Sequence, residues 1–333
     1  MSTRAVKPAE KRSLVTVRGS GTVLSTVFPW ALAFGSSLLL SLAGCHRQDP
    51  DAAAVQRVFG TTGLGSGEFS YPRAIAVSPV DGCVFVVDKS PTARIQRFSP
   101  DGVFERLWSM PEAKEGKPTG LYVDVQNRLW VADTHYQRIV AFDRDGRELF
   151  RFGEKGEGPG QFVFPTVAVL DRDGNIYVGE YGGNDRISKF SPDRKYLFSF
   201  ADKTAGDGWV ERPAGLAFDT EDVLWVTDSC HHRVCRYGRD GKFLSAFGSP
   251  GDRPENLNYP YGLAIEDSGA ILVADRGNNR IIRFSKDGGF LGSWGRQGRA
   301  KGEIAQPWSV AVAKDGLTYC LDSWNNRVQV IDW

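Results

Sequence analysis

The sequence lacks the motifs on which several common kinds of chemistry depend. It contains 5 cysteines in 333 residues, and no Cys-x-x-Cys-His element occurs, so a covalently attached c-type haem is not expected. A phosphate-binding P-loop and the Gly-x-Ser-x-Gly element of nucleophilic hydrolases are also absent. The motifs therefore indicate no cofactor.

An excess of positive charge is missing from most of the chain. The sequence has 41 basic and 40 acidic side chains, and five of the basic residues but only one acidic residue lie within residues 1–45. Residues 46–333 therefore hold 36 basic and 39 acidic side chains, a formal charge of −3. Because binding to nucleic acid depends on neutralising phosphate charge, this slightly acidic body is not expected to bind DNA or RNA.

Charged residues are also absent from Gly19 to Gly44, where an apolar run follows a basic N-terminal segment. This order is typical of a secretory signal, and the sequence Leu42-Ala43-Gly44-Cys45 resembles the lipobox of bacterial lipoproteins. The resemblance implies a lipoprotein signal peptide over residues 1–44, acylation of Cys45 and a tether over residues 45–54. The body would then be exported and anchored by lipid to a membrane, facing the periplasm or the cell exterior. The alternative is an uncleaved anchor, since the charge-free run is long enough to span a bilayer.

The rest of the chain repeats one unit six times. Each unit has a proline, a short apolar strand, a second apolar strand that ends in an acidic residue, and an arginine five or six residues later. The prolines are Pro72, Pro118, Pro165, Pro213, Pro260 and Pro307; the acids are Asp88, Asp133, Glu180, Asp228, Asp275 and Asp322; the arginines are Arg94, Arg138, Arg186, Arg233, Arg280 and Arg327. Successive members of each series lie 44 to 48 residues apart.

Each unit is expected to fold as four antiparallel strands joined by tight turns. In the fifth unit the strands fall at 262–265, 271–274, 280–284 and 290–294, and the segments between them have turn compositions. Six such sheets around an axis bury their faces against one another, which predicts an all-β, six-bladed β-propeller over residues 55–333. The sixth unit ends after its third strand and residues 55–60 resemble a fourth, so the N-terminal strand is predicted to close the last blade.

Two of these units resemble the NHL repeat family of propellers. The matching stretches are Ala274-Asp275-Arg276-Gly277-Asn278-Asn279-Arg280-Ile281 and Asp322-Ser323-Trp324-Asn325-Asn326-Arg327-Val328. The resemblance extends over residues 55–333 and is weakest in the first unit, which lacks the Asn pair. It implies the propeller fold without implying one function.

The repeats separate framework residues from candidate site residues. An acid and an arginine present in every unit are expected to form structural ion pairs. Binding residues are sought where the pattern varies, on the face that carries the loops before the first strand and between the second and third strands, because Tyr, Trp and Arg commonly anchor binding surfaces. The candidates are Arg73, Tyr261 and Trp308 just after the blade prolines, and His135, Tyr136, Tyr181, His231, His232 and Trp324 in the loops.

No catalytic residue and no metal ligand is predicted. His231 and His232 stand between Cys230 and Cys235, but adjacent side chains of a hairpin usually point apart and no second ligand cluster is evident. Cys230 could pair with Cys235 in an exported protein, and Cys83 and Cys320 are either bonded or buried free thiols. The disulfides therefore stay open at this point.

Enzymes of similar fold differ from this sequence at their metal sites. The peptidyl-hydroxyglycine amidating lyases, which this chain resembles in fold, hold zinc with His placed directly after the blade proline, and none of the six positions here is His. Calcium lactonase-type propellers need Glu, Asp and Asn around the channel, whereas these positions hold Arg, Thr, Ala, Tyr and Trp.

The sequence therefore favours a non-enzymatic binding or scaffold module. It would be tethered to a membrane and would engage a protein, peptide or glycan with its loop face, as an accessory subunit of a membrane complex would. The alternative is an exported metal-dependent lyase or lactonase-like hydrolase that acts at the mouth of the central channel. RNA binding, known in some cytoplasmic propellers of this kind, conflicts with both export and the acidic body.

Overall fold

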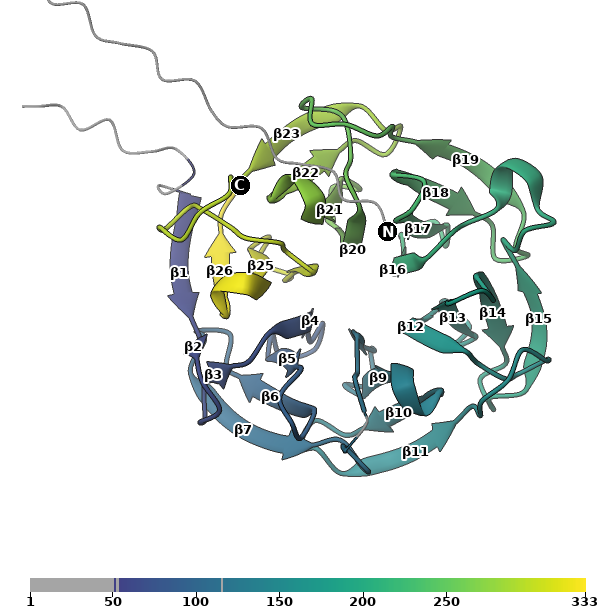
Figure 1. Cartoon of the computed structure of the whole chain (residues 1–333), viewed down its shortest axis with the longest axis horizontal. Coiled ribbons are helices and arrows are strands. Elements are labelled where there is room, and N and C mark those ends of the chain that lie inside the picture. Colours follow the sequence, from purple (N-terminus) through teal and green to yellow (C-terminus); the bar gives the residue numbers. More distant parts are fainter. Residues whose placement is uncertain (1–50, 52–53, 115) are drawn as a thin grey trace, which may run out of the picture. The chain divides into compact units, whose positions relative to one another are not determined.

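The computed structural model describes residue 51, residues 54–114 and residues 116–333. The predicted signal peptide, the predicted acylation site Cys45 and most of the predicted tether lie outside these residues. The described strands form six four-stranded antiparallel sheets around a central axis (Figure 1), which confirms the predicted all-β, six-bladed propeller. In this part of the chain, no helix combines the length and the apolar character needed to cross a membrane.

Each blade runs from an innermost strand to a strand at the rim. Blade 1 contains β4 (Pro72–Val77), β5 (Val84–Asp88), β6 (Arg94–Phe98) and β7 (Phe104–Ser109). Blade 2 contains β8 (Gly120–Val123), β9 (Leu129–Asp133), β10 (Arg138–Phe142) and β11 (Glu148–Phe152). Blade 3 contains β12 (Phe164–Leu170), β13 (Ile176–Tyr181), β14 (Arg186–Phe190) and β15 (Tyr196–Phe200).

The other three blades have the same construction. Blade 4 contains β16 (Pro213–Phe218), β17 (Leu224–Asp228), β18 (Arg233–Tyr237) and β19 (Phe243–Phe247). Blade 5 contains β20 (Pro260–Ile265), β21 (Ile271–Asp275), β22 (Arg280–Phe284) and β23 (Phe290–Trp294). Blade 6 contains β24 (Ser309–Val312), β25 (Thr318–Asp322), β26 (Arg327–Ile331) and, at its rim, β1 (Val55–Phe59). Short elements complete the described chain: the parallel pair β2 (Thr61–Thr62) and β3 (Glu68–Phe69), and the 3-10 turns η1 (Thr134–Tyr136), η2 (Gly206–Gly208), η3 (Arg276–Asn278) and η4 (Ser323–Asn325).

The N-terminal strand closes the ring, as the repeat count predicts. β1 pairs antiparallel with β26, with Val58 opposite Gln329 and Phe59 opposite Val328. The preceding residues also contact the propeller: the carbonyl of Ala54 accepts a hydrogen bond from the Asp332 N–H at 3.0 Å, and that of Asp51 accepts one from the Trp294 indole at 2.8 Å. Since both chain ends share one sheet, the last blade forms only when both are in place.

The second strand of each blade is buried on both faces because neighbouring blades cover it. All five residues of β5, β9, β17, β21 and β25 are buried, which explains their continuous apolar runs in place of alternation. Aromatic side chains fill the wedges between blades; Trp108 of β7, for example, lies edge-on to Phe85 of its own blade and against Phe142 of blade 2.

A buried ion pair fixes the same loop in every blade. The acid at the end of the second strand bonds the arginine that begins the third, at 2.5 to 2.9 Å in all six blades. In blade 5, Arg280 bonds Asp275 at 2.8 Å and also donates to the carbonyls of Arg253 and Asn256 in the loop before the innermost strand. Burial raises the pKa of the Asp275 carboxyl, so this carboxylate depends on Arg280 and on the N–H of Asn258 to stay charged.

The innermost strands approach one another so closely that some positions tolerate only glycine. A Cβ added to Gly262 of β20 would lie 2.8 Å from the Cα of Ser309 in β24, and one added to Gly215 of β16 would lie 2.7 Å from the carbonyl oxygen of Tyr261. Because the obstructing atoms belong to the backbone, a change of side-chain rotamer cannot relieve the clash. This close approach sets the width of the central channel.

We therefore predict that Gly262→Ala destabilises the propeller by about 2 kcal/mol, because the added methyl group forces two backbones apart. Chemical denaturation followed by tryptophan fluorescence measures the change. Gly292→Ala on the rim strand β23 is the matched control, since its methyl group would meet only the Trp333 ring, at 3.3 Å. Equal losses in the two variants would contradict the proposed close packing of the innermost strands.

Candidate functional site

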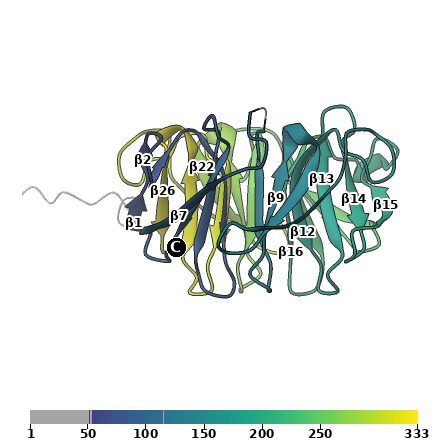
Figure 2. The ribbon, with the colours of Figure 1, turned by 90° about the horizontal axis from the view of Figure 1, so that it is seen from below.

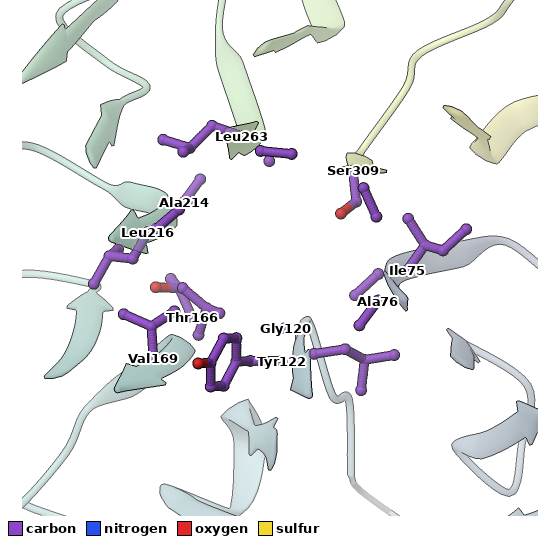
Figure 3. Close-up of a pocket in the computed structure, with 18 of the residues that line it drawn as sticks. Ile75, Ala76, Gly120, Tyr122, Thr166, Val169, Ala214, Leu216, Leu263 and Ser309 are labelled. Atoms are coloured by element: carbon purple, nitrogen blue, oxygen red, sulfur yellow. The ribbon is translucent and has the colours of Figure 1, made fainter. Parts of the chain in front are cut away.

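The innermost strands surround a central channel with a cavity of about 610 Å³. Its walls are mostly aliphatic and small side chains from all six blades; Figure 3 shows Ile75, Ala76, Val169, Leu216 and Leu263 among them. Among the described residues that line the channel there is no aspartate and no glutamate. The channel is therefore apolar along its walls, and any strong polar recognition must come from its ends.

The polar end of the channel lies where the innermost strands begin, at the loop face that the sequence analysis singled out. We call this end the channel mouth, and it consists of Tyr71, Arg73, Lys89, Lys117, Tyr181, Arg212, Tyr261, Arg276 and Trp308. Figure 2 shows the blades from the side, with the loops gathered at the two ends of the strands. The residues of the channel mouth lie within three residues of the start of an innermost strand or at the end of a second strand.

Arginine side chains at the channel mouth stack on aromatic rings instead of pairing with acids. The Arg73 guanidinium lies 4.9 Å from the Trp308 ring centre and 5.7 Å from that of Tyr71. Its Nε is buried without a hydrogen-bond partner. Burial lowers the pKa of Arg73, and the nearby Arg212 contributes in the same direction. Stacking covers the face of a guanidinium and leaves its N–H edge available.

Two further arginines repeat this arrangement on the other side of the channel mouth. Arg212 lies 4.7 Å from the ring centre of Tyr181 and 5.5 Å from that of Tyr261. Arg276 lies 5.3 Å from the Tyr261 ring and donates a hydrogen bond to the Gln306 side chain at 2.7 Å. Burial raises the pKa of the Tyr261 phenol, so this ring stays neutral beside the two cations.

The hydroxyl of Tyr71 joins two tryptophans at this end of the channel. It accepts hydrogen bonds from the indole of Trp308 at 3.2 Å and from that of Trp324 at 3.3 Å. Both bonds use the lone pairs of the oxygen, and among the described residues the structure records no acceptor for its proton. Trp324 keeps 57% of its surface exposed and forms the outer edge of this cluster.

The five cations of the channel mouth have no ion-pair partner within the described part of the chain. Arg73, Lys89, Lys117 and Arg212 line the channel, and Arg276 lies beside the Tyr261 and Trp308 rings. The carboxylate of Asp185 lies near Arg212, but its oxygens accept the backbone N–H groups of Arg212 and Gly183. The channel mouth therefore combines unpaired positive charge with hydrogen-bond donors and aromatic rings.

The structure brings together some of the predicted binding residues and separates others. Arg73, Tyr261, Trp308, His135 and Tyr181 line the channel, and Trp324 joins them through Tyr71. Tyr136, His231 and His232 do not line it. The ring of Tyr136 lies under the framework arginine of its own blade, Arg138, at 4.7 Å.

The two adjacent histidines occupy framework positions. His231 Nδ1 lies 2.8 Å from Asp228, as the Asn278 side chain lies 2.8 Å from Asp275 in the next blade. His232 accepts the N–H of Tyr259 in the neighbouring blade at 3.0 Å. In the same way Asn279 accepts the N–H of Gln306 and Asn326 accepts that of Tyr71, so these three side chains link successive blades.

Sequence reasoning missed the residues that precede the blade prolines. Tyr71 and Arg212 lie there with φ of 54° and 61°. Neither is a glycine or an asparagine, so the sequence does not indicate this left-handed backbone. Lys89 and Arg276, each directly after the acid of its blade, were missed as well. Aligning the six units at these two positions would have shown the same variation that drew attention to the position after the proline.

The described residues contain no metal-binding cluster and no disulfide. No group of three or more His, Cys, Asp or Glu side chains there is arranged to hold a metal ion. Cys83, Cys230, Cys235 and Cys320 are free thiols, which closes the question that the sequence left open for these four residues. Burial raises the pKa of the Cys235 thiol to about 12, so it stays protonated at neutral pH.

These features define the class of protein as a six-bladed β-propeller with an aromatic and cationic channel mouth. The family model described as NHL repeat matches residues 211–237 and 257–284, so the chain is a propeller that contains NHL repeats. Both matched segments lie in blades 4 and 5, where the Asn or His links to the next blade occur.

Known proteins resemble the chain over part of their length. Protein brain tumor of Drosophila melanogaster is 30% identical over 133 residues, which are 40% of this chain and 12% of that protein. Human NHL repeat-containing protein 3 is 31% identical over 183 residues, which are 48% of this chain and 50% of that protein. The chain thus spans half or less of the length of these relatives.

Among solved structures, a gluconolactonase from Xanthomonas campestris has a similar fold. The TM-score is 0.61 at 16% identity, over 80% of this chain and 87% of that one. At such low identity the likeness concerns the fold alone.

If His232 is a link between blades, its role should be transferable to asparagine. We predict that His232→Asn changes the free energy of unfolding by less than about 0.5 kcal/mol, because Asn279 and Asn326 perform the same role and tolerate a positive φ. His232→Ala should cost about 1 kcal/mol or more through the lost hydrogen bond. Urea denaturation measures both, and an equal loss in the two variants would contradict the assignment.

Proposed function

We propose that this propeller is a non-enzymatic binding or scaffold module that engages a protein, peptide or glycan with its loop face. The observation that carries the proposal is the aromatic cluster in which Trp308 and Trp324 share the Tyr71 hydroxyl. Large aromatic side chains held rigidly by hydrogen bonds lose little entropy when they bind, and such residues dominate the energetics of binding surfaces.

The surroundings of this cluster support docking of a partner over the face. Trp324 is 57% exposed, and Leu64, in the loop before the innermost strand of blade 1, is 61% exposed. The carbonyl of Leu64 accepts a hydrogen bond from the framework Arg94, so the loop is fixed while its apolar side chain faces outward. A rigid backbone that presents apolar side chains is suited to recognition without a large ordering cost.

We also propose that the module works at a membrane surface. The sequence Leu42-Ala43-Gly44-Cys45 supports acylation of Cys45 after export, and the anchored propeller would face the periplasm or the cell exterior. The contacts of Asp51 and Ala54 with blades 5 and 6 support a short connection, because fewer than ten residues separate Cys45 from the ring. Such a tether would confine the propeller close to its membrane.

An exported lyase or lactonase-like hydrolase is the second candidate. The observation in its favour is the channel itself, since a cavity of about 610 Å³ is of the size that holds a small substrate. The guanidinium groups of Arg73, Arg212 and Arg276 weigh against a metal-dependent version, because they would repel a divalent cation at the channel mouth. Turnover of a lactone by the purified protein would favour the enzyme.

A photo-crosslinking amino acid at Leu64 tests the binding face. In its own membrane, the protein should form one dominant crosslinked adduct from this position and none from Ser268, which lies in an exposed turn at the opposite end of blade 5. Trp308→Ala combined with Trp324→Ala should reduce the yield at least tenfold, because about 2 kcal/mol or more resides in such anchors. Mass spectrometry of the adduct identifies the partner, and unchanged crosslinking in the double variant would overturn the proposed face.

Acylation of Cys45 has its own test. Intact mass spectrometry of the unaltered protein should show acylated Cys45 as the N-terminal residue, whereas Cys45→Ser should show neither the acyl group nor cleavage before residue 45. Cys83→Ser is the matched control, because Cys83 is buried in the propeller. An unaltered protein without an acyl group on Cys45 would contradict anchoring by lipid.

A further inference from the structure

The central channel offers a site that the proposed docking face does not explain. A partner lying across the loops would contact Trp324 and the outer rings, but a folded partner is too wide to enter a cavity of about 610 Å³. The side chains that line the channel are cationic and aromatic at its mouth and mostly aliphatic further in. A ligand site in this interior would go beyond the proposed function.

The channel mouth is an arrangement of donors and cations that lacks an acceptor. No carboxylate among the described residues pairs with the guanidinium edges of Arg73 and Arg212, and the buried Nε of Arg73 has no partner. The Tyr71 oxygen already accepts two indole N–H groups, so its proton is available to a further acceptor. Buried donors are rarely left unsatisfied, and an oxyanion would satisfy these at once.

Positive charge also accumulates at the channel mouth beyond the two stacked arginines. Lys89 and Lys117 line the same cavity, and no acidic side chain lines it among the described residues. Burial lowers the pKa of Arg73, and the positive charge of Arg212 lowers it further, so a bound anion would stabilise the charged guanidinium. Low-dielectric walls strengthen the field of such a group and favour a bound anion.

Below the channel mouth the walls change to aliphatic side chains. Leu121, Leu216 and Leu263 lie on the innermost strands of blades 2, 4 and 5, and they line the channel together with Val123 and Val310. Figure 3 shows side chains of this kind around the opening. A wholly polar ligand would gain little from these walls, whereas an alkyl or aryl body would be removed from water against them.

We propose that the channel binds a small amphiphile, with its oxyanion head between Arg73 and Arg212 and its apolar body between the innermost strands. A carboxylate and a phosphate share the chemistry that this mouth recognises, since both accept paired N–H donors from a guanidinium. The Tyr71 hydroxyl donates a further hydrogen bond to the head group. The aromatic rings that stack on the guanidinium groups keep their edges directed at the head.

Calorimetric titration of the purified propeller with octanoate and octyl phosphate tests the proposal. At least one of the two should bind, while octanol, which lacks the charge, and acetate, which lacks the body, should each bind at least tenfold more weakly. Octanoate bound more tightly than octyl phosphate would assign the carboxylate as the head group, and the reverse would assign the phosphate. Acetate or octanol bound as tightly as both octyl anions would overturn the proposal.

Substitutions then locate the site. Arg73→Met and Arg212→Met keep the length of the side chain and remove the charge, and each should weaken binding of the octyl anion about tenfold or more, since a charge-assisted hydrogen bond contributes about 1.5–3 kcal/mol. Arg106→Met on the exposed rim strand β7 is the matched control and should leave binding unchanged. Ala214→Phe, which narrows the channel, should weaken octyl anions without weakening inorganic phosphate.

Failure of this site is distinguishable from failure of the docking face. Wild-type protein that binds neither octyl anion, or Arg73→Met and Arg212→Met variants that bind as tightly as wild type, would overturn the channel site. Crosslinking from Leu64 would be unaffected by either result. Circular dichroism of each variant confirms that the propeller is folded.

Discussion

The buried pair of an acid and an arginine is the interaction on which the rest of the propeller depends. In each blade the arginine satisfies both a carboxylate with no access to water and the carbonyls of the loop that leads into the innermost strand, as Arg327 does with Asp322, Ala300 and Glu303. An unpaired carboxylate at such a depth would cost several kcal/mol. The pair therefore positions the loop face of the propeller, whatever residues that face carries.

Because the arginine bonds loop carbonyls and not loop side chains, one ring can combine a regular framework with an irregular site. The loops are held by their carbonyl groups, so their side chains are free to differ from blade to blade. The links between blades also bond the backbone of the neighbouring loop. At four junctions an Asn, Asp or His side chain accepts the N–H of the residue before the next proline. At two of these junctions that next residue is Tyr71 or Arg212, so the link also sets the backbone of a channel-mouth residue.

The fold was predictable because its signal is repeated six times, and the site was only partly so because its signal is not. Apolar strands ending in an acid are visible in any one unit, and the missing fourth strand of blade 6 identified β1. Arg73, Tyr261 and Trp308 could be chosen because their position varies while the neighbouring proline does not. Tyr71 could not, because its role depends on a φ of 54° and on two indole groups from residues more than 230 positions away in sequence.

The adjacent histidines show the opposite difficulty. His231 and His232 are conspicuous because the sequence has few histidines, yet they make the contacts that asparagines make in other blades. His231 contacts the blade acid as Asn278 does, and His232 accepts an N–H of the next blade as Asn279 does. Aligning Cys230-His231-His232-Arg233 with Gly277-Asn278-Asn279-Arg280 would have placed both in the framework. A rare residue at a repeated position is therefore better interpreted first by the role of that position.

Net charge is likewise a poor guide to what a closed ring can bind. Residues 46–333 carry a formal charge of −3, yet the channel mouth gathers Arg73, Arg212, Lys89 and Lys117 around one opening. A polyanion such as nucleic acid is recognised by cations spread along a surface at the spacing of its phosphates. Cations that converge on a narrow, apolar channel instead suit a single anionic group, because only one such group fits between them while its apolar body leaves water.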